Sequence, residues 1–344
     1  MSPSAIPPHP SSASRAPQRL ALPPLALDSG RMLRDATIAY HVDGALNARR
    51  DNVVLVLHAL TGSADAAGDW WAPQIGPARA IDTTRWAVLA PNLLGSCYGS
   101  SGPSSIDGFP VLTVRDQARA IAVLLERLGI ERVALVVGGS LGGMVALEFA
   151  AGFPGRALRA LVFAAPARLG AGAIAWSAVQ RQALALGGDA GLALARQIAM
   201  LSYRTAPGLD ARFGRERGRD GSFRVSEWLA RHGERLVARM DAETYRTLID
   251  VMDTHDVAGD RGGIGERLRA SRTQFTGVGI PGDLFCDASE VQAWVRAAGG
   301  AYRELHSVHG HDAFLIEHAQ VSALLREALG ESATAAASAV EVAA

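Results

Sequence analysis

Short apolar runs alternate along this chain with longer amphipathic stretches. The runs at 52–60 and 132–139 are dominated by aliphatic side chains, which is typical of strands buried on both faces of a sheet. The same texture predicts further strands over 85–91, 157–166, 273–283 and 301–308. Helical spacing between them predicts helices over 113–130, 141–153, 289–300 and 312–330. This alternation predicts an α/β fold with a mostly parallel, doubly wound sheet.

One segment, 169–257, interrupts the alternation, because it has helical spacing and charge but no convincing strand. We expect it to form a helical lid insertion over the carboxyl ends of the strands, where open α/β sheets bind ligands. The core domain is then formed by 20–168 together with 258–330. The Pro-, Ser- and Ala-rich start, 1–19, predicts a disordered leader, and the alanine-rich end, 331–344, predicts a frayed tail.

The charge balance excludes several classes of partner. The 344 residues include 34 basic and 34 acidic side chains, so the formal net charge is zero. A protein that binds nucleic acid or an anionic membrane usually has a basic excess, and we expect neither partner here. No apolar run reaches the length of about 18 residues that spans a bilayer. With only two cysteines there is no disulfide framework, which favours a cytoplasmic protein.

The first candidate for chemistry is Ser140 in the stretch VVGGSLGGMVALEFA, residues 136–150. It lies between glycine pairs where a predicted strand becomes a predicted helix, and Gly138 to Gly142 match G-x-S-x-G. A tight turn there would present the hydroxyl above the helix N-terminus, whose free N–H groups favour developing negative charge. The alternative is a glycine-rich turn with an incidental serine.

A serine nucleophile needs a base, and the late stretch HSVHGHDAFL, 306–315, supplies two candidates. His311 lies after a predicted strand and opens the last predicted helix, so we prefer it as the base. His309 is the rival, while His318 falls inside that helix and is expected to be an ordinary side chain.

The orienting carboxylate and the oxyanion donors follow from the same topology. Asp283 stands directly after an apolar run, whereas Asp287 resembles a helix N-cap, so Asp283 takes the orienting role. The oxyanion hole would combine the backbone N–H of Leu141 with that of Leu60 in HALTGSAD. A simple polar turn after a core strand is the alternative for HALTG. No metal site is expected.

Five blocks of sequence together resemble the homoserine O-acetyltransferase family of the α/β-hydrolase fold. They are HALTGSAD…WW…IGPARAIDT, PNLLGSCYGSSGPSS, FPVLTVRDQ…LLERLGI, VVGGSLGGMVALEFA and GHDAFLIEH. The resemblance covers residues 20 to 328 and is looser in the middle third, where LARQIAMLSYRT matches best. The segment GDLFCDASE departs from the family by being short and lacking two prolines.

The resemblance implies a triad of Ser140, Asp283 and His311. It also implies substrate contacts by Arg196, to the acceptor, and by Asp312, to the acceptor's amino group. Without the resemblance, Arg196 would be a surface residue by default and Asp312 a helix N-cap.

The reaction implied is ping-pong: the serine takes an acetyl group from acetyl-CoA, a co-substrate, and passes it to the hydroxyl of L-homoserine in methionine biosynthesis. No permanently bound cofactor is implied, and related enzymes are homodimers packed through the helical insertion.

Other reactions remain open at this point. The same triad would serve a serine O-acyltransferase, a succinyl-CoA-using homoserine transferase, or an esterase or thioesterase, and a non-catalytic binding protein is a further class. Succinyl-using relatives place an arginine two residues after the catalytic Asp, and this chain has Phe285 there. An apolar wall suits a methyl group and rejects a carboxylate, so acetyl-CoA is the expected donor.

Overall fold

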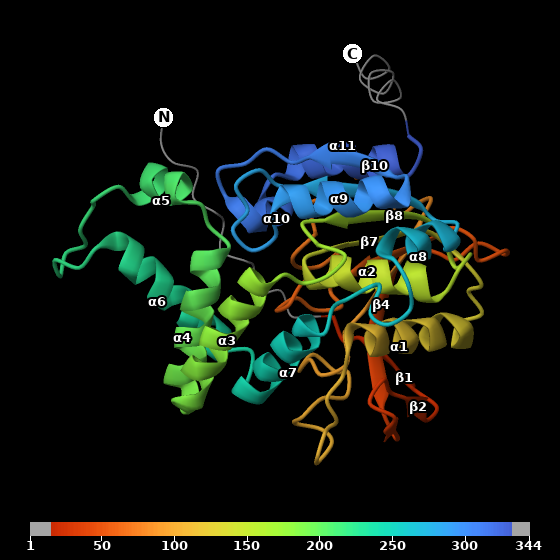
Figure 1. Ribbon diagram of the computed structural model, residues 1–344, viewed down its shortest axis with the longest axis horizontal. Coiled ribbons are helices and arrows are strands. Elements are labelled where there is room, and N and C mark those ends of the chain that lie inside the picture. The colour runs from red at the N-terminus through yellow and green to blue at the C-terminus, as the bar shows by residue number, and fades with distance from the viewer. Residues whose placement is uncertain (1–14, 332–344) are drawn as a thin grey trace.

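A sheet of eight strands runs through the molecule in the order β1-β4-β6-β5-β7-β8-β9-β10 (Figure 1). The structure, a computed structural model, describes residues 15–331, so the tail predicted beyond Glu331 lies outside it. The strands are β1 Gln18–Ala21, β4 Thr37–Asp43, β5 Val53–Leu57, β6 Ala87–Pro91, β7 Val133–Gly139, β8 Ala157–Phe163, β9 Gln274–Gly279 and β10 Ala301–Glu304. Strands β5 to β10 run parallel to one another, and β4, which lies between β6 and β1, runs antiparallel to both of these neighbours. The predicted doubly wound α/β fold is confirmed.

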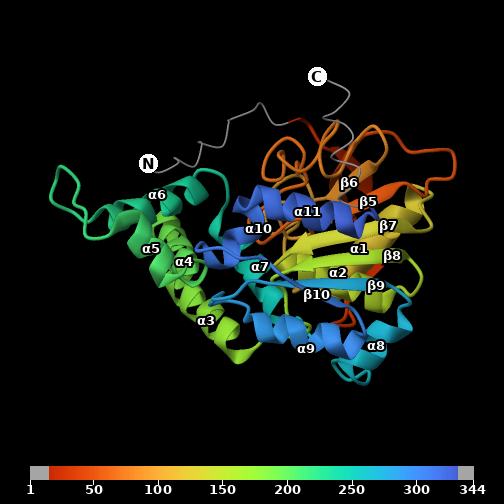
Figure 2. The same ribbon diagram turned by 90° about the horizontal axis from the view of Figure 1, so that it is seen from above.

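Both faces of the sheet are buried, as the aliphatic runs require. Leu55 and Leu57 of β5 belong to one core cluster and Val54 and Val56 to a second, because successive side chains point to opposite faces. The flanking helices are α1 Val114–Arg127, α2 Leu141–Gly152, α8 Ile264–Ala270, α9 Ala288–Ala298 and α11 His318–Ala328. Figure 2 shows α9 and α11 on opposite sides of the sheet.

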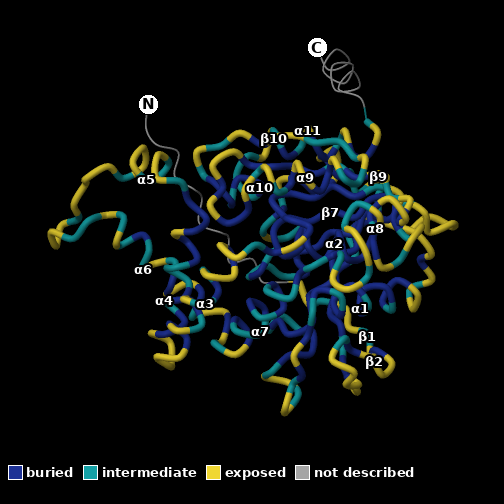
Figure 3. The backbone as a smooth tube through the Cα atoms, in the orientation of Figure 1, coloured by how far each residue is buried: buried dark blue, intermediate teal, exposed yellow. Residues whose placement is uncertain are grey.

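The segment between β8 and α8 forms a helical layer beside the sheet (Figure 1). Its helices are α3 Ala171–Ala185, α4 Gly188–Ser202, α5 Ala206–Phe213, α6 Arg224–Val237 and α7 Ala242–Asp253. In Figure 3 the sheet is buried, whereas the connection between α5 and α6 is largely exposed. Helices α3, α4 and α7 contribute residues to the same core cluster as α1 and α2, so the insertion is packed onto the core.

The two ends of this insertion, residues 166–169 and 255–257, are hydrogen-bonded to each other, and we call this pair of segments the neck. The Leu169 N–H donates to the His255 carbonyl and the Val257 N–H donates to the Ala167 carbonyl, each at 2.9 Å. His255 Nε2 lies 2.8 Å from the Pro166 carbonyl. Burial lowers the pKa of His255 to about 4, so the ring is neutral and its Nε2–H donates that bond. The two ends of the insertion are therefore tied to each other.

The predicted leader, 1–19, is too long. Strand β1 begins at Gln18 and pairs with β4, and the Arg15 guanidinium lies 2.6 Å from the Asp65 carboxylate. This strand is a mostly exposed edge strand, so its residues carry no apolar alternation that a sequence pattern could detect. The residues before Arg15 lie outside the described part of the chain.

The last predicted helix, 312–330, is broken. It divides into α10, Ala313–Ile316, and α11, with Glu317 at the junction. The Trp71 indole donates a hydrogen bond of 3.2 Å to the Phe314 carbonyl, which a continuous helix would use internally. The hydrogen bond from Trp71 thus takes the place of the one that the Phe314 carbonyl would accept within a continuous helix.

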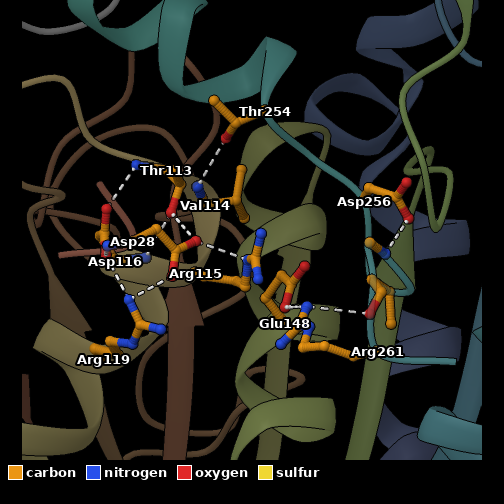
Figure 4. A network of polar contacts seen from close by, with 12 residues as sticks. Asp28, Thr113, Val114, Arg115, Asp116, Arg119, Glu148, Thr254, Asp256 and Arg261 are labelled. Atoms are coloured by element: carbon orange, nitrogen blue, oxygen red, sulfur yellow. Dashed lines mark hydrogen bonds and ion pairs between the residues drawn. The ribbon is translucent and has the colours of Figure 1, made fainter. Parts of the chain in front are cut away.

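A network of polar contacts fixes the N-terminus of α1 (Figure 4). Asp116 and Thr113 form a capping box, and the Asp116 carboxylate also accepts the Asp28 N–H at 2.9 Å. The Asp28 carboxylate lies 2.7 Å from Arg115 and 2.6 Å from Arg119. Because the Asp116 side chain is fully buried, each of its partners is needed to offset lost hydration.

The same network reaches α2 and the end of the insertion. The Val114 N–H donates to the Thr254 hydroxyl at 3.1 Å, and the buried Glu148 pairs with Arg261 at 3.5 Å (Figure 4). Burial raises the pKa of Glu148, against the influence of Arg261, so the pairing offsets only part of the cost of burying this carboxylate. These contacts connect helix α1, helix α2 and the segment that follows α7.

Replacing Asp116 by alanine should lower the free energy of unfolding by about 2–3 kcal/mol, because it removes a cap and leaves buried N–H groups unpaired. Urea denaturation followed by circular dichroism measures the change. Glu126→Ala, on the exposed face of the same helix, is the matched control and should change stability by under about 0.5 kcal/mol. Equal stability of the two variants would contradict the role given to the network.

Candidate active site

Ser140 occupies a sharp turn between β7 and α2. Its φ of 54° and ψ of −125° lie in a region that side-chain-bearing residues rarely adopt, which costs about 1–3 kcal/mol. The turn is held by the Ser140 N–H, which donates to the Phe163 carbonyl of β8 at 3.0 Å. The strand–turn–helix context expected for the nucleophile is therefore present.

The surrounding glycines allow this turn because no side chain would fit beside it. A Cβ added to Gly138 would lie 2.5 Å from backbone atoms of Gly142, and one added to Gly142 would lie 2.1 Å from the Leu57 carbonyl oxygen. Both contacts are with backbone, which cannot move away as a flexible side chain could. The glycines thus let α2 begin directly against the ends of β5 and β7.

A continuous chain of hydrogen bonds joins Ser140, His311 and Asp283. His311 Nε2 lies 2.8 Å from Ser140 Oγ, and His311 Nδ1 lies 2.6 Å from Asp283 Oδ2. The carboxylate assigns the proton to Nδ1, so Nε2 is free to accept the serine proton. Burial alone would lower the pKa of His311, but the charge and hydrogen bond of Asp283 outweigh it and raise the pKa.

Backbone groups hold the carboxylate in place. Asp283 Oδ1 accepts the N–H of Phe285 at 2.8 Å and that of Cys286 at 3.0 Å, which leaves Oδ2 for His311. Asp287 is confirmed as the N-cap of α9, where its carboxylate accepts the Ser289 N–H at 2.7 Å. The structure therefore places Asp283 against His311 and Asp287 at the start of α9, which are the positions that the sequence predicted.

The rival histidine does not reach the serine. The ring of His309 makes no hydrogen bond with another described residue, while its backbone carbonyl accepts a bond of 3.3 Å from Arg204. Burial lowers the pKa of His309, and the nearby Arg204 lowers it further. His318 is exposed at the first position of α11, as expected of an ordinary side chain.

The two proposed oxyanion donors follow neighbouring parallel strands, Leu60 after β5 and Leu141 after β7. Residues 59–62 form a tight turn in which the Gly62 N–H donates to the Ala59 carbonyl at 2.9 Å. The Leu60 N–H in this turn donates to no other group within residues 15–331. Leu141 is the first residue of α2, where an N–H has no partner inside the helix. Within residues 15–331, both backbone N–H groups are thus without an acceptor in the protein.

Arg196 and Tyr203 share one face of α4, seven residues apart. The Arg196 guanidinium lies 5.9 Å from the centre of the Tyr203 ring, and that ring stacks on His311 with centres 5.2 Å apart. Arg196 is half-buried and forms no ion pair with another described residue. Arg196 is therefore a cation that lies against the Tyr203 ring, which in turn stacks on His311.

Asp312 does not cap a helix with its side chain. It stands at the N-cap position of α10, but its carboxylate makes no cap hydrogen bond. Instead Asp312 Oδ2 lies 2.7 Å from Arg204 Nη1, and both side chains are largely buried. Arg204 lies in the stretch LARQIAMLSYRT, but the sequence gives no sign of this role. Nothing in one sequence indicates which carboxylate a given arginine will pair with.

Aromatic rings cover the remaining side of His311. The Phe285 ring lies 4.9 Å from the His311 ring and 5.8 Å from that of Tyr203, centre to centre. Phe285 and Cys286 are buried, whereas Leu284 is 57% exposed and turns away from the core. The wall expected to be apolar is therefore formed by Phe285 and Tyr203, and Tyr203 was not predicted.

Two features are absent from the described part of the chain. Within residues 15–331, no helix is both long and apolar enough to cross a membrane. The same residues contain no cluster of three or more His, Cys, Asp or Glu side chains suited to a metal ion.

Comparison with known proteins agrees with this geometry. Residues 52–233 match the α/β-hydrolase fold family model. The chain is 44% identical to a homoserine O-acetyltransferase of Thermus thermophilus, over 93% of this chain and 92% of that protein. A solved homoserine O-acetyltransferase from Staphylococcus aureus superposes with a TM-score of 0.80 at 28% identity, over 90% of this chain and 94% of that one. Esterase E22 superposes with a TM-score of 0.82 at 21% identity, over 91% and 99%, which shows the shared fold.

Fluorophosphonate labelling should report the state of the hydrogen-bonded chain. Attack by Ser140 requires neutral His311, so the labelling rate should fall as pH decreases through the raised pKa, with a midpoint above 6.5. Mass spectrometry after timed labelling measures the rate at each pH. His309→Ala should be labelled like the native protein, and Ser140→Ala should not be labelled. Rapid labelling of His311→Ala would assign the base elsewhere.

Proposed function

The chain belongs to the homoserine O-acetyltransferase family of the α/β-hydrolase fold, and from that membership we propose that it transfers an acetyl group from acetyl-CoA to L-homoserine. The observation that carries the proposal is the continuous chain from Ser140 through His311 to Asp283, with an unpaired cation, Arg196, nearby. The product would be O-acetylhomoserine, and the reaction is proposed to serve methionine biosynthesis. No resident cofactor is needed for this chemistry.

In the proposed first half-reaction, Ser140 Oγ attacks the thioester carbonyl while His311 Nε2 accepts its proton. The carbonyl oxygen becomes an oxyanion, and the N–H groups of Leu60 and Leu141 stabilise it. When the tetrahedral intermediate collapses, the carbon–sulfur bond breaks. His311 returns the proton to the leaving thiolate, and the acetyl group remains on the serine.

In the proposed second half-reaction, His311 Nε2 removes the proton of the homoserine hydroxyl, and the hydroxyl oxygen attacks the acetyl-serine carbonyl. When this tetrahedral intermediate collapses, the bond between the carbonyl carbon and Ser140 Oγ breaks, and Oγ takes the proton back from His311. Arg196 would bind the acceptor's carboxylate, and Asp312 would bind its ammonium group. Asp312 Oδ2 is already paired with Arg204, so Oδ1 is the oxygen available to the ammonium. Because each step returns the triad to its starting protonation, the cycle needs no other acid or base.

The donor preference follows from the wall beside His311. A succinyl thioester carries a second carboxylate, and burying it without a cation is costly. Phe285 and Tyr203 present rings there, and the nearby Arg204 is neutralised by Asp312. These contacts support acetyl-CoA as the donor.

We also propose that the insertion serves two purposes, as a lid that excludes water and as the contact surface of a homodimer. The proposed contact surface is supported by large apolar side chains that are exposed on α3, at its C-cap and on α4. These are Ile174, Val179, Leu186, Leu194 and Leu201. Light scattering would show the mass in solution.

A thiol-release assay tests the proposed function directly. Acetyl-CoA and succinyl-CoA are each combined with homoserine, with serine and with water alone, and free CoA is measured with a thiol reagent. We expect kcat/KM to be highest for acetyl-CoA with homoserine and water to be a poor acceptor. Turnover with water equal to that with homoserine would identify an esterase or thioesterase, and a preference for succinyl-CoA would reverse the donor assignment. Ser140→Ala should lose activity by several orders of magnitude.

Arg196→Ala separates the two half-reactions. Loss of a charge-assisted bond to the acceptor carboxylate should reduce kcat/KM for homoserine by roughly 30-fold or more. The pre-steady-state burst of CoA, which reports serine acetylation, should stay within about twofold of the native rate because the thioester does not use this contact. Unchanged acceptor kinetics would exclude Arg196 from substrate binding.

A further inference from the structure

The connection between α6 and α7 lies against two loops of the core, and Arg239 makes the contact. Its Nη1 atom donates to the Thr61 carbonyl at 2.6 Å and to the Tyr98 hydroxyl at 2.7 Å. Thr61 belongs to the turn after β5, and Tyr98 belongs to the loop after β6. One nitrogen of the insertion therefore joins two loops that follow neighbouring strands.

The turn at 59–62 has few other attachments. The Ala59 carbonyl accepts the Gly62 N–H within the turn, and it also lies 2.8 Å from His58 Nδ1. His58 Nε2 in turn accepts the Leu93 N–H at 3.0 Å. Burial lowers the pKa of His58 to about 4, so this ring is neutral, with one donor and one acceptor. These bonds hold the first half of the turn.

The second half of the turn depends on Arg239. Among the described residues, the Thr61 carbonyl accepts a hydrogen bond only from this guanidinium. The Leu60 N–H lies in the same turn, one residue before Thr61. The Thr61 carbonyl and the Gly62 N–H share one planar peptide unit, and the Ala59 carbonyl and the Leu60 N–H share another. Arg239 fixes the first unit, whose N–H bonds the Ala59 carbonyl and so helps to fix the direction of the Leu60 N–H. If the Thr61 carbonyl lost its partner, the first unit could rotate and this support of the second unit would be weakened.

We infer that Arg239 is a positioning residue for acyl transfer, which holds the turn so that the Leu60 N–H points at the developing oxyanion. The inference rests on the proposed acyl-transfer function. An oxyanion donor is effective only when it is held in place before the reaction begins, because reorienting it during the reaction costs free energy. The insertion would then form part of the catalytic apparatus in addition to covering it.

The position of Arg239 is itself fixed by packing. The Cys97 thiol lies 3.5 Å from the Arg239 backbone carbonyl and donates to it. A Cβ added to Gly95 would lie 2.8 Å from the Thr247 methyl group of α7, so this loop and α7 are in close contact. Burial raises the pKa of Tyr98, and its hydroxyl stays neutral as the second acceptor. The guanidinium therefore acts from a rigid support although its side chain is exposed.

The test compares Arg239→Ala with Arg235→Ala and Arg239→Lys. Arg235 is an exposed cation on α6 that forms no hydrogen bond or ion pair with another described residue, so its removal is the matched control. Both bonds of Arg239 come from one nitrogen, so the ammonium group of a lysine can replace both. We measure acylation with p-nitrophenyl acetate, turnover of acetyl-CoA with homoserine, and melting temperature.

Arg239→Ala should lower the acylation rate and kcat by roughly tenfold or more, with the KM for homoserine within about twofold of native. Affinity for phenethyl trifluoromethyl ketone, to which Ser140 adds to form a tetrahedral oxyanion, should fall by a similar factor. Arg239→Lys should recover most of the loss, and Arg235→Ala should match the native protein in all assays.

Equal kinetics and equal ketone affinity for Arg239→Ala and Arg235→Ala would overturn the inference. So would a loss that Arg239→Lys fails to recover when its melting temperature is native. Failure of the native protein to use acetyl-CoA with homoserine would instead reject the proposed function, because p-nitrophenyl acetate still reports the oxyanion hole. The two failures are therefore distinguishable.

Discussion

The backbone conformation of Ser140 is the constraint on which the rest of this structure depends. A residue with a side chain is held at positive φ, and the cost must be offset by the surrounding packing. Strands β5, β7 and β8 supply that packing, because their carboxyl ends meet at the turn and are buried on both faces. One requirement, to hold the Ser140 hydroxyl in a fixed position, thus accounts for three features. They are the parallel sheet, the glycines on either side of the serine, and the start of α2 directly against the end of β5.

The groups around the serine come from two layers with different physical characters. The core supplies Ser140, Asp283, His311 and the turn at 59–62, and backbone hydrogen bonds hold Ser140, Asp283 and this turn. The insertion supplies Arg196, Arg204 and Tyr203, which are long side chains on one helix and its C-terminal end. Backbone positioning suits chemistry that must not change, whereas side chains on an added layer can be exchanged for a different substrate. This division agrees with the occurrence of the same fold in an esterase.

The features that could be predicted from the sequence are those that depend on neighbouring residues in the chain. Continuous runs of aliphatic residues predict the buried strands. The order of Ser140, Asp283 and His311 in the chain, and their positions after strands, predict that these three residues act together. The sequence does not predict β1, a short and mostly exposed strand, or the break at Glu317, where an indole distant in the sequence bonds the Phe314 carbonyl. The pairing of Arg204 with Asp312 was equally inaccessible, because many arginines in the chain could have served. Contacts between distant polar side chains leave no periodic signal.

The neck of the insertion has a consequence for the evolution of this fold. Leu169 donates a hydrogen bond to His255, and Val257 donates one to Ala167, so each end of the insertion is bonded to the other end. These bonds hold the two ends together and do not involve the helices of the insertion. The entropy of closing such a loop grows only slowly with its length. Lineages can therefore lengthen, shorten or replace the helices beyond the neck while the sheet below keeps its geometry. The neck is a natural crossover point at which a segment from another lineage, or one made by protein engineering, could be grafted.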